Sequence, residues 1–133
     1  GVFFNGSAQR TLMIDNIAPF CSDVGNQDRN LMKFIADNYW SEASPNPEAA
    51  YPRLGVNNSQ VANNMKPSSF WMRNGNFLRF KTLELGYSFS FCRIYLSGDN
   101  LAVWSPFKLW DPELSYSAYP LQRAINIGAQ FTF

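Results

Sequence analysis

The sequence predicts an all-β fold built from long amphipathic strands, and three observations carry this prediction. Residues 124–133 alternate without a break between apolar side chains and small or polar ones, which is the period of a strand with two different faces. Aromatic residues make up 17% of the chain and charged residues 16%, where about 25% charged is usual. Long stretches rich in proline, asparagine and serine separate the strands. Both a soluble β-sandwich and a transmembrane β-barrel satisfy this pattern.

The composition argues against several classes of function. The formal net charge is +1 and the basic residues are spread singly, so the chain lacks the basic stripe that nucleic-acid binding requires. The sequence has no histidine, which removes Ser-His-Asp and Cys-His catalysis and most zinc sites from this segment. We therefore expect no enzyme, no metal, no cofactor and no nucleic-acid partner.

Four segments have the alternation of β-strands. They span about residues 2–12, 77–89, 93–100 and 123–133. The first is interrupted by Phe3, which lies on its otherwise polar face. Ser90–Cys92 is short enough for a tight turn, so the second and third strands form a hairpin. In the second strand the alternation inverts on the N-terminal side of Thr82, and a β-bulge would explain the inversion.

Two long irregular stretches, about 13–76 and 101–122, lie between the strands, and their prolines argue against further strands. Within the first, residues 27–40 have apolar side chains at helical spacing, with Asp28 placed to cap them, which predicts one short helix. Long structureless loops are uncommon in compact soluble domains, whereas they are expected on the extracellular side of a barrel.

Several motifs in the C-terminal two-thirds of the chain resemble one family when they are taken in order. They are residues 69–87 (SFWMRNGNFLRFKTLELGY), 94–101 (IYLSGDNL), 111–113 (DPE), 119–120 (YP) with Arg123, and 128–133 (GAQFTF). Their order and spacing resemble the end of SusC/RagA-type TonB-dependent outer-membrane transporters. The sequence departs from the family at Ser90–Cys92, where many members carry a longer, proline-containing connection. Phe133 resembles the C-terminal insertion signal of outer-membrane barrels.

The resemblance implies that residues 1–133 are the C-terminal part of a transmembrane β-barrel, the last four antiparallel strands of 22, with both long loops extracellular. It implies TonB-dependent uptake of oligosaccharides or peptides across a Gram-negative, Bacteroidetes-like outer membrane. The implied partners are a SusD-like surface lipoprotein, TonB (through parts outside this segment), outer-membrane lipid and the substrate. The chain starts at Gly1 without a signal peptide, so we expect a fragment or a processed piece of an exported protein.

An orientation follows if Phe133 lies in the periplasm. The turn at Ser90–Cys92 then lies in the periplasm as well, and Cys21 lies in an outer loop. The apolar band between Cys21 and Cys92 is about 25 Å tall, while a disulfide requires Cα atoms within about 7 Å. We therefore predict that these two cysteines do not pair.

The same orientation gives a role to four basic residues at the outer ends of the strands. These are Arg10, Arg79, Lys81 and Arg123. On lipid-facing parity they reach the outer interface, roughly 19–23 Å above the inner one, where basic side chains can contact lipid headgroups. The hypothesis is a lipid-headgroup belt. An alternative of equal weight is that a bulge turns some of them to the lumen, or that neighbouring acids pair with them.

The second loop is rich in rings that could contact substrate or the lipoprotein partner. They are Trp104, Phe107, Trp110, Tyr116 and Tyr119. Rings stack on sugars and fill hot spots of interfaces, and packing of the loop on itself is the equal alternative. The acids Asp111 and Glu113 flank Pro112, and we interpret them as a structural turn rather than a catalytic pair.

Three functions are compatible with these features. The first is outer-membrane uptake, and the second is a barrel that serves as a scaffold without transport. The third is a soluble glycan-binding β-sandwich, which should show more than four strands with turns every 8–12 residues, roughly. The long loops count against the third, and the sequence of this segment does not separate the first two.

Overall fold

A computed structural model of the chain describes residues 1–14, 17, 31–55, 62–64, 66–115 and 118–132. The chain divides into two compact units. Gly1–Leu12 and Arg73–Phe133 form one unit, which we call the sheet unit, and Met13–Met72 form the other, which we call the loop unit.

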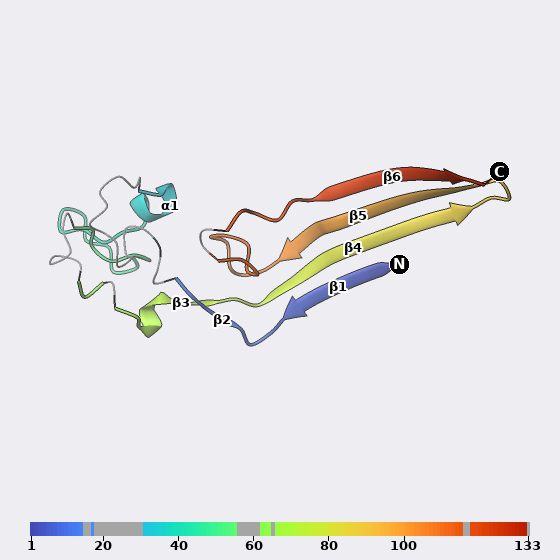
Figure 1. Ribbon diagram of the computed structural model, residues 1–133. Helices are drawn as coiled ribbons and strands as arrows, with labels where there is room; N and C mark the ends of the chain where they lie inside the picture. Colours follow the sequence, from blue (N-terminus) through green and yellow to red (C-terminus); the bar gives the residue numbers. More distant parts are fainter. Residues whose placement is uncertain (15–16, 18–30, 56–61, 65, 116–117, 133) are drawn as a thin grey trace. The chain divides into compact units, whose positions relative to one another are not determined.

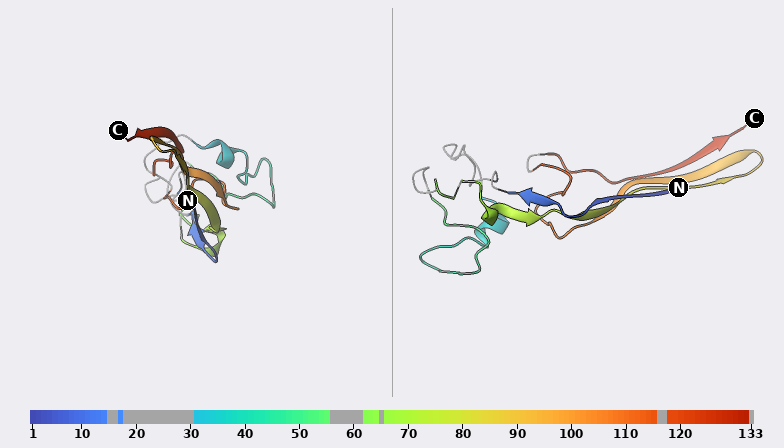
Figure 2. Two further views of the ribbon diagram at one scale, coloured as in Figure 1. Left: turned by 90° about the vertical axis from the view of Figure 1, so that its right-hand side faces the viewer. Right: turned by 90° about the horizontal axis from the view of Figure 1, so that it is seen from below.

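The sheet unit contains a four-stranded sheet in the order β1-β4-β5-β6. The strands are β1 Val2–Ser7, β4 Phe77–Ser88, β5 Cys92–Trp104 and β6 Ala124–Phe131. All neighbouring pairs are antiparallel, as the all-β prediction requires. The four strands run side by side in Figure 1 and in the two further views of Figure 2. β1 and β6 form the two edges of this sheet.

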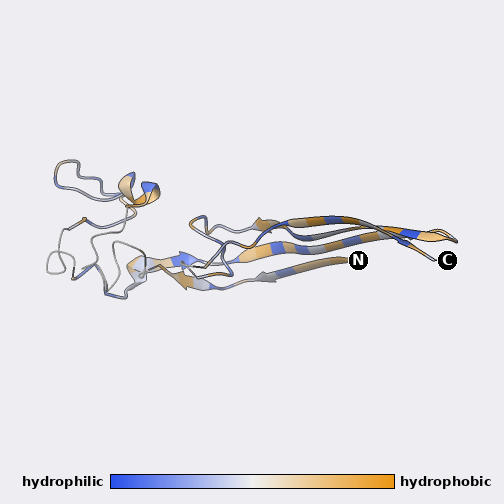
Figure 3. Ribbon diagram, turned by 45° about the horizontal axis from the view of Figure 1, so that its top comes forward, coloured by the Kyte–Doolittle hydropathy of each residue, from blue (hydrophilic) through white to orange (hydrophobic). Residues whose placement is uncertain are grey.

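Strict alternation gives the sheet two chemically different faces, and Figure 3 shows the alternating hydropathy along the strands. Leu85, Leu96 and Ile127 are cross-strand partners on β4, β5 and β6, so their side chains share one face. The next row, Glu84, Ser97 and Asn126, shares the other face. We call these the apolar face and the polar face.

A β-bulge at Lys81 explains the inverted pattern in β4. The pairing of β4 with β5 shifts between Phe80 and Thr82, and the pairing with β1 shifts at the same place, so Lys81 is the extra residue. One extra residue reverses the faces that strict alternation would assign to the residues before it in β4. Phe80 therefore lies on the apolar face with its partner Phe4, and Arg79 lies on the polar face with its partner Asn5.

Two strands end where the sequence did not predict. The first predicted strand is broken into β1 and the short β2, Thr11–Met13, because Gln9 adopts a left-handed backbone with φ of 57°. β5 continues to Trp104, four residues beyond the predicted end at Asn100. Asn100 has φ of 53°, a conformation that asparagine tolerates, so the strand bends there and then resumes pairing.

The hairpin between β4 and β5 turns tightly, as predicted, but Cys92 already belongs to β5. The Phe89 N–H donates to the Cys92 carbonyl oxygen at 2.7 Å, which leaves Ser90 and Phe91 as the turn. The Thr132 N–H donates to the Phe91 carbonyl oxygen at 3.1 Å. The turn is therefore tied to the residue that follows β6.

The loop unit is mostly irregular, with a small core of Ile14, Ile17, Ile35, Tyr51 and Trp71. The predicted helix is a single turn, α1 Lys33–Ala36, which begins after Met32 without a side-chain cap. The 3-10 turn η1, Ser69–Trp71, leads into β3, Met72–Asn74, which pairs with β2. Extended pairing here corrects the expectation that 13–76 would contain no strand. None of the helices among the described residues is long and apolar enough to cross a membrane.

Candidate functional site

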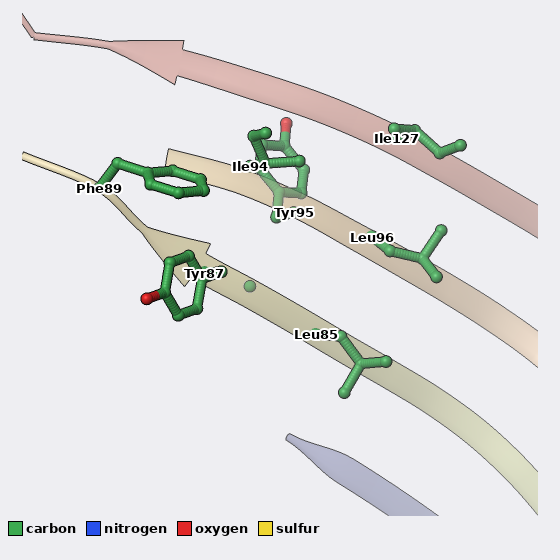
Figure 4. Close-up of a pocket in the computed structure, with 8 residues that line it drawn as sticks. Leu85, Tyr87, Phe89, Ile94, Tyr95, Leu96 and Ile127 are labelled. Carbon is green, nitrogen blue, oxygen red and sulfur yellow. The ribbon is translucent and has the colours of Figure 1, made fainter. Parts of the chain in front are cut away.

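The apolar face of the sheet is open along its whole length. It carries a continuous row of large side chains, of which Ile127 is 81% exposed and Leu85 is 54% exposed. Figure 4 shows Leu85, Leu96 and Ile127 side by side across β4, β5 and β6, where they line a shallow groove of about 520 Å³. Soluble monomers rarely expose contiguous apolar patches of this kind, which are typical of surfaces that contact a membrane or another protein.

Aromatic rings gather at both ends of the apolar face. At the turn end, Tyr87 packs edge-on against Phe89 with ring centroids 4.8 Å apart. At the opposite end, Phe4 and Phe80 stack at 4.7 Å. Trp104 on β5 is the cross-strand partner of Leu78 on β4, near these rings, and it is 53% exposed. Aliphatic residues fill the space between, an arrangement typical of a membrane-spanning sheet with aromatic girdles.

Long side chains on the polar face interact with residues of neighbouring strands. Arg93 donates to Glu84 at 3.1 Å, and both side chains are about half exposed. The ring of Tyr95 lies over Gly128, its cross-strand partner, so closely that a Cβ atom on Gly128 would overlap it. Because Gly128 has no side chain, the Tyr95 ring can occupy the space above it.

The end of the polar face that lies away from the β4–β5 turn holds a buried ionic network around Arg79, whose side chain is 2% exposed. Its Nη2 donates to both carboxylate oxygens of Asp111 at 2.6 and 2.7 Å, and its Nε donates to Glu113. Its Nη1 donates to Asn100, and Asn5 donates to Glu113 at 3.1 Å. The five residues come from β1, β4, β5 and the segment after β5, and we call them the Arg79 network.

This network corrects one member of the predicted lipid-headgroup belt. A guanidinium that is 2% exposed and binds two carboxylates is shielded from lipid phosphates, so Arg79 does not belong to the belt. The physical reason is the bulge at Lys81, which turns Arg79 to the polar face. Lys81 and Arg123 are exposed, and Arg10 lies over the ring of Phe77 with 5.9 Å to its centroid.

The predicted aromatic cluster of the second loop is not one cluster. Phe107 is buried and packs edge-on against Trp110, with centroids 4.8 Å apart, so these two rings pack within the loop. Trp104 belongs to β5. Tyr119 is 78% exposed, and its hydroxyl accepts a hydrogen bond from Gln122 at 3.4 Å. Contact of these rings with a substrate or partner stays a prediction, and Tyr119 is the most exposed of the rings that the structure describes.

Four residues named from the sequence lie outside the described residues. They are Cys21, Asp28, Tyr116 and Phe133. Cys92 is described and is a free, buried thiol. The predicted cap at Asp28 is wrong, because α1 begins after Met32. The absence of a Cys21–Cys92 bond and the insertion signal at Phe133 stay predictions.

The arrangement contains no evident catalytic machinery among the described residues. Asp111 and Glu113 are occupied by Arg79, as expected for a structural turn, and Asp111 also accepts a hydrogen bond from the Glu113 N–H at 3.0 Å. No group of three or more candidate metal ligands occurs in the described part of the chain. The sheet therefore presents an exposed apolar surface on one face and hydrogen-bonding side chains on the other.

Sequence reasoning missed Asn5 and Asn100, which complete the Arg79 network. Asn100 also donates from Nδ2 to the carbonyl oxygens of Leu121 and Gln122, both at 3.1 Å. An asparagine within an alternating strand was the available signal, because asparagine favours left-handed backbone and irregular pairing.

Two curated proteins of Formosa agariphila match the chain. TonB-dependent receptor P26 is 29% identical over 124 residues, which cover 74% of this chain and 12% of the receptor. TonB-dependent receptor P3 is 26% identical over 141 residues, which cover 98% of this chain and 13% of the receptor. The chain thus spans about an eighth of the length of these relatives.

No family model and no solved structure matches the chain. The receptor matches are compatible with the SusC/RagA type but do not single it out from other types. The two matches show that the chain is similar to a segment of TonB-dependent receptors.

Proposed function

We propose that this chain is part of the wall of an outer-membrane β-barrel that takes up nutrients in a TonB-dependent way. The observation that carries the proposal is the pair of opposite faces on β4, β5 and β6. The apolar face would contact lipid, and the polar face would line the lumen. β1 and β6 would pair at their free edges with further strands of the barrel, since a sheet edge cannot stay open in lipid.

The dimensions of the strands support this proposal. β4 has 12 residues and β5 has 13. At a rise of about 3.3 Å per residue and a tilt of about 45°, strands of this length climb roughly 26–28 Å. An apolar band of about 25 Å between aromatic girdles is the height expected in outer-membrane barrels. The Ser90-Phe91 turn would lie in the periplasm with the C-terminus, and the segments 13–76 and 105–123 would connect the strands at the extracellular end of the barrel.

The finer parts of the proposal follow from the sequence motifs. We propose a SusC/RagA-type transporter of 22 strands, a SusD-like lipoprotein partner, and oligosaccharides or peptides as substrates. Arg10, Lys81 and Arg123 would contact lipid headgroups at the outer interface, and Phe133 would act as the insertion signal. The names of the relatives support TonB-dependent uptake in general and leave the substrate open.

Site-directed labelling tests the wall assignment. Cysteine is placed at Ile127 or at Asn126 in the full-length receptor, which are neighbours in β6 with opposite facing. We expect Ile127→Cys to react with a lipid-soluble maleimide and to resist a water-soluble one. We expect Asn126→Cys to show the reverse preference. Equal reaction of both positions with the water-soluble reagent would support the soluble β-sandwich instead.

Uptake is tested with fluorescent libraries of oligosaccharides and of peptides. Cells with the receptor should accumulate members of one library, and deletion of the receptor or of TonB should abolish the accumulation. Normal lipid labelling without any TonB-dependent accumulation would support the scaffold function over transport.

A further inference from the structure

The segment 105–115, which follows β5, folds back over the polar face of the sheet. Both faces are defined by the register, and Asn5 and Arg79 are cross-strand partners on the polar face. The network's two acids, Asp111 and Glu113, reach Arg79 from this segment. If the polar face lines a lumen, as the proposed function holds, this segment lies inside the outer end of that lumen.

The segment is attached to the sheet at its start as well as at its middle. The Ser105 hydroxyl donates to the carbonyl oxygen of Asn76 at 2.7 Å, and the same oxygen of Ser105 accepts from the Phe107 N–H at 3.1 Å. Phe107 and Pro112 are buried. Asn100 then fixes the returning chain at Leu121 and Gln122. These contacts hold the segment 105–115 at two points and the chain that returns to β6 at a third.

The ion pairs of Arg79 with Asp111 and Glu113 are costly to break. Arg79 cannot lose its proton, and its side chain is buried, so lifting Asp111 and Glu113 away would leave a desolvated positive charge. Of the described residues that lie opposite Arg79 across the strands, Asn5 and Val103 carry no charge. Neither of these two residues can therefore replace the lost pair.

We propose that Arg79 is a positioning residue, and that it holds the segment 105–115 as a fixed constriction of the outer lumen rather than as a gate that opens. The location in a lumen rests on the proposed function, whereas the docking of the segment on Arg79 is a property of the sheet unit alone. A fixed constriction would limit which substrates pass, since its width would not change during uptake.

Hydrogen–deuterium exchange of the purified full-length receptor tests the docking. The double substitution Asp111→Asn with Glu113→Gln removes both counter-charges, and Glu84→Gln on the same face breaks an exposed ion pair as the matched control. We expect exchange in the segment 105–115 to rise at least about tenfold in the double variant and to stay unchanged in the control. Unchanged exchange in the double variant would overturn the role of Arg79.

Crosslinking tests whether the segment moves, and it leaves the network intact. Ala8 and Lys108 are exposed and line one cavity beside the segment, so Ala8→Cys with Lys108→Cys should react with a short bis-maleimide. We expect the crosslink to form and uptake of the fluorescent libraries to continue at the rate of the uncrosslinked variant. Failure to crosslink, or uptake blocked by the crosslink, would overturn the fixed constriction. Absence of uptake before crosslinking would instead count against transport, while the exchange result would still decide the docking.

Discussion

The two ends of the sheet are stabilised by different kinds of interaction. At the turn end, from Thr82 to Ser88 and from Cys92 to Asp99, every second residue faces the apolar side without exception in the register. At the opposite end, the alternation fails at Lys81 and a charged side chain is buried under the segment after β5. The first region is held by repetitive pairing, and the second depends on one specific network.

The difference teaches where single substitutions should matter. Side chains on the apolar face of the turn end are exposed in the isolated sheet, so their contribution depends on the surrounding medium. Arg79 and its partners interact within the chain, so their contribution should persist in any medium. The four predictions below test this contrast, and the free energy of unfolding of the full-length receptor in lipid bilayers is the common measurement.

Deletion of Lys81 should have the largest effect. Without the extra residue, Phe77–Phe80 would change faces, which would point Arg79 toward the apolar side and break its network. We expect a loss of about 5 kcal/mol or more, which combines a broken buried ion pair with a cation in lipid. Lys81→Ala keeps the bulge and should lose less than about 1 kcal/mol, and equal losses in the two variants would show that the bulge does not set the register.

Removal of the two acids that face Arg79 should come next. Asp111→Asn with Glu113→Gln leaves the buried guanidinium without a counter-charge, and we expect a loss of about 3–5 kcal/mol. The exposed pair of Arg93 and Glu84 gives the control, because Glu84→Gln should change stability by about 1 kcal/mol or less. Similar losses in both variants would contradict the contrast between the two ends of the sheet.

A charge on the apolar face of the turn end should have an intermediate effect that depends on lipid. We expect Ile127→Lys to lose about 2–4 kcal/mol in bilayers, because the side chain would lie near the middle of the membrane. Asn126→Lys on the opposite face should be nearly neutral. If Asn126→Lys were the more harmful substitution, the assignment of the two faces would be reversed.

A side chain at Gly128, where the Tyr95 ring lies, should lower the free energy of unfolding least of the four changes. Gly128→Val places a side chain where the Tyr95 ring lies, and overpacking of this kind costs about 1–3 kcal/mol. Ala129→Val, one residue along β6 and on the apolar face, is the matched control and should be close to neutral. Adding Tyr95→Ala to Gly128→Val should restore part of the loss, and no restoration would place the strain elsewhere.

The sequence by itself determined the sheet and its faces. The period-two pattern of β4, β5 and β6 predicted three antiparallel strands, because a half-exposed strand must separate apolar from polar side chains. It also placed the tight turn near Ser90 and indicated that something irregular happens beside Thr82. These features are local, so the sequence of each segment contains the information.

Only the tertiary structure decided what the irregularity does. A bulge and a lipid-facing row of basic residues predict the same sequence pattern, and the contacts of Arg79 with Asp111 and Glu113 distinguish them. Those acids lie more than 30 residues away in the chain, and the separations are 32 for Asp111 and 34 for Glu113. An ion pair between residues so far apart depends on how the segment after β5 folds back. The local alternation of side chains does not predict that fold.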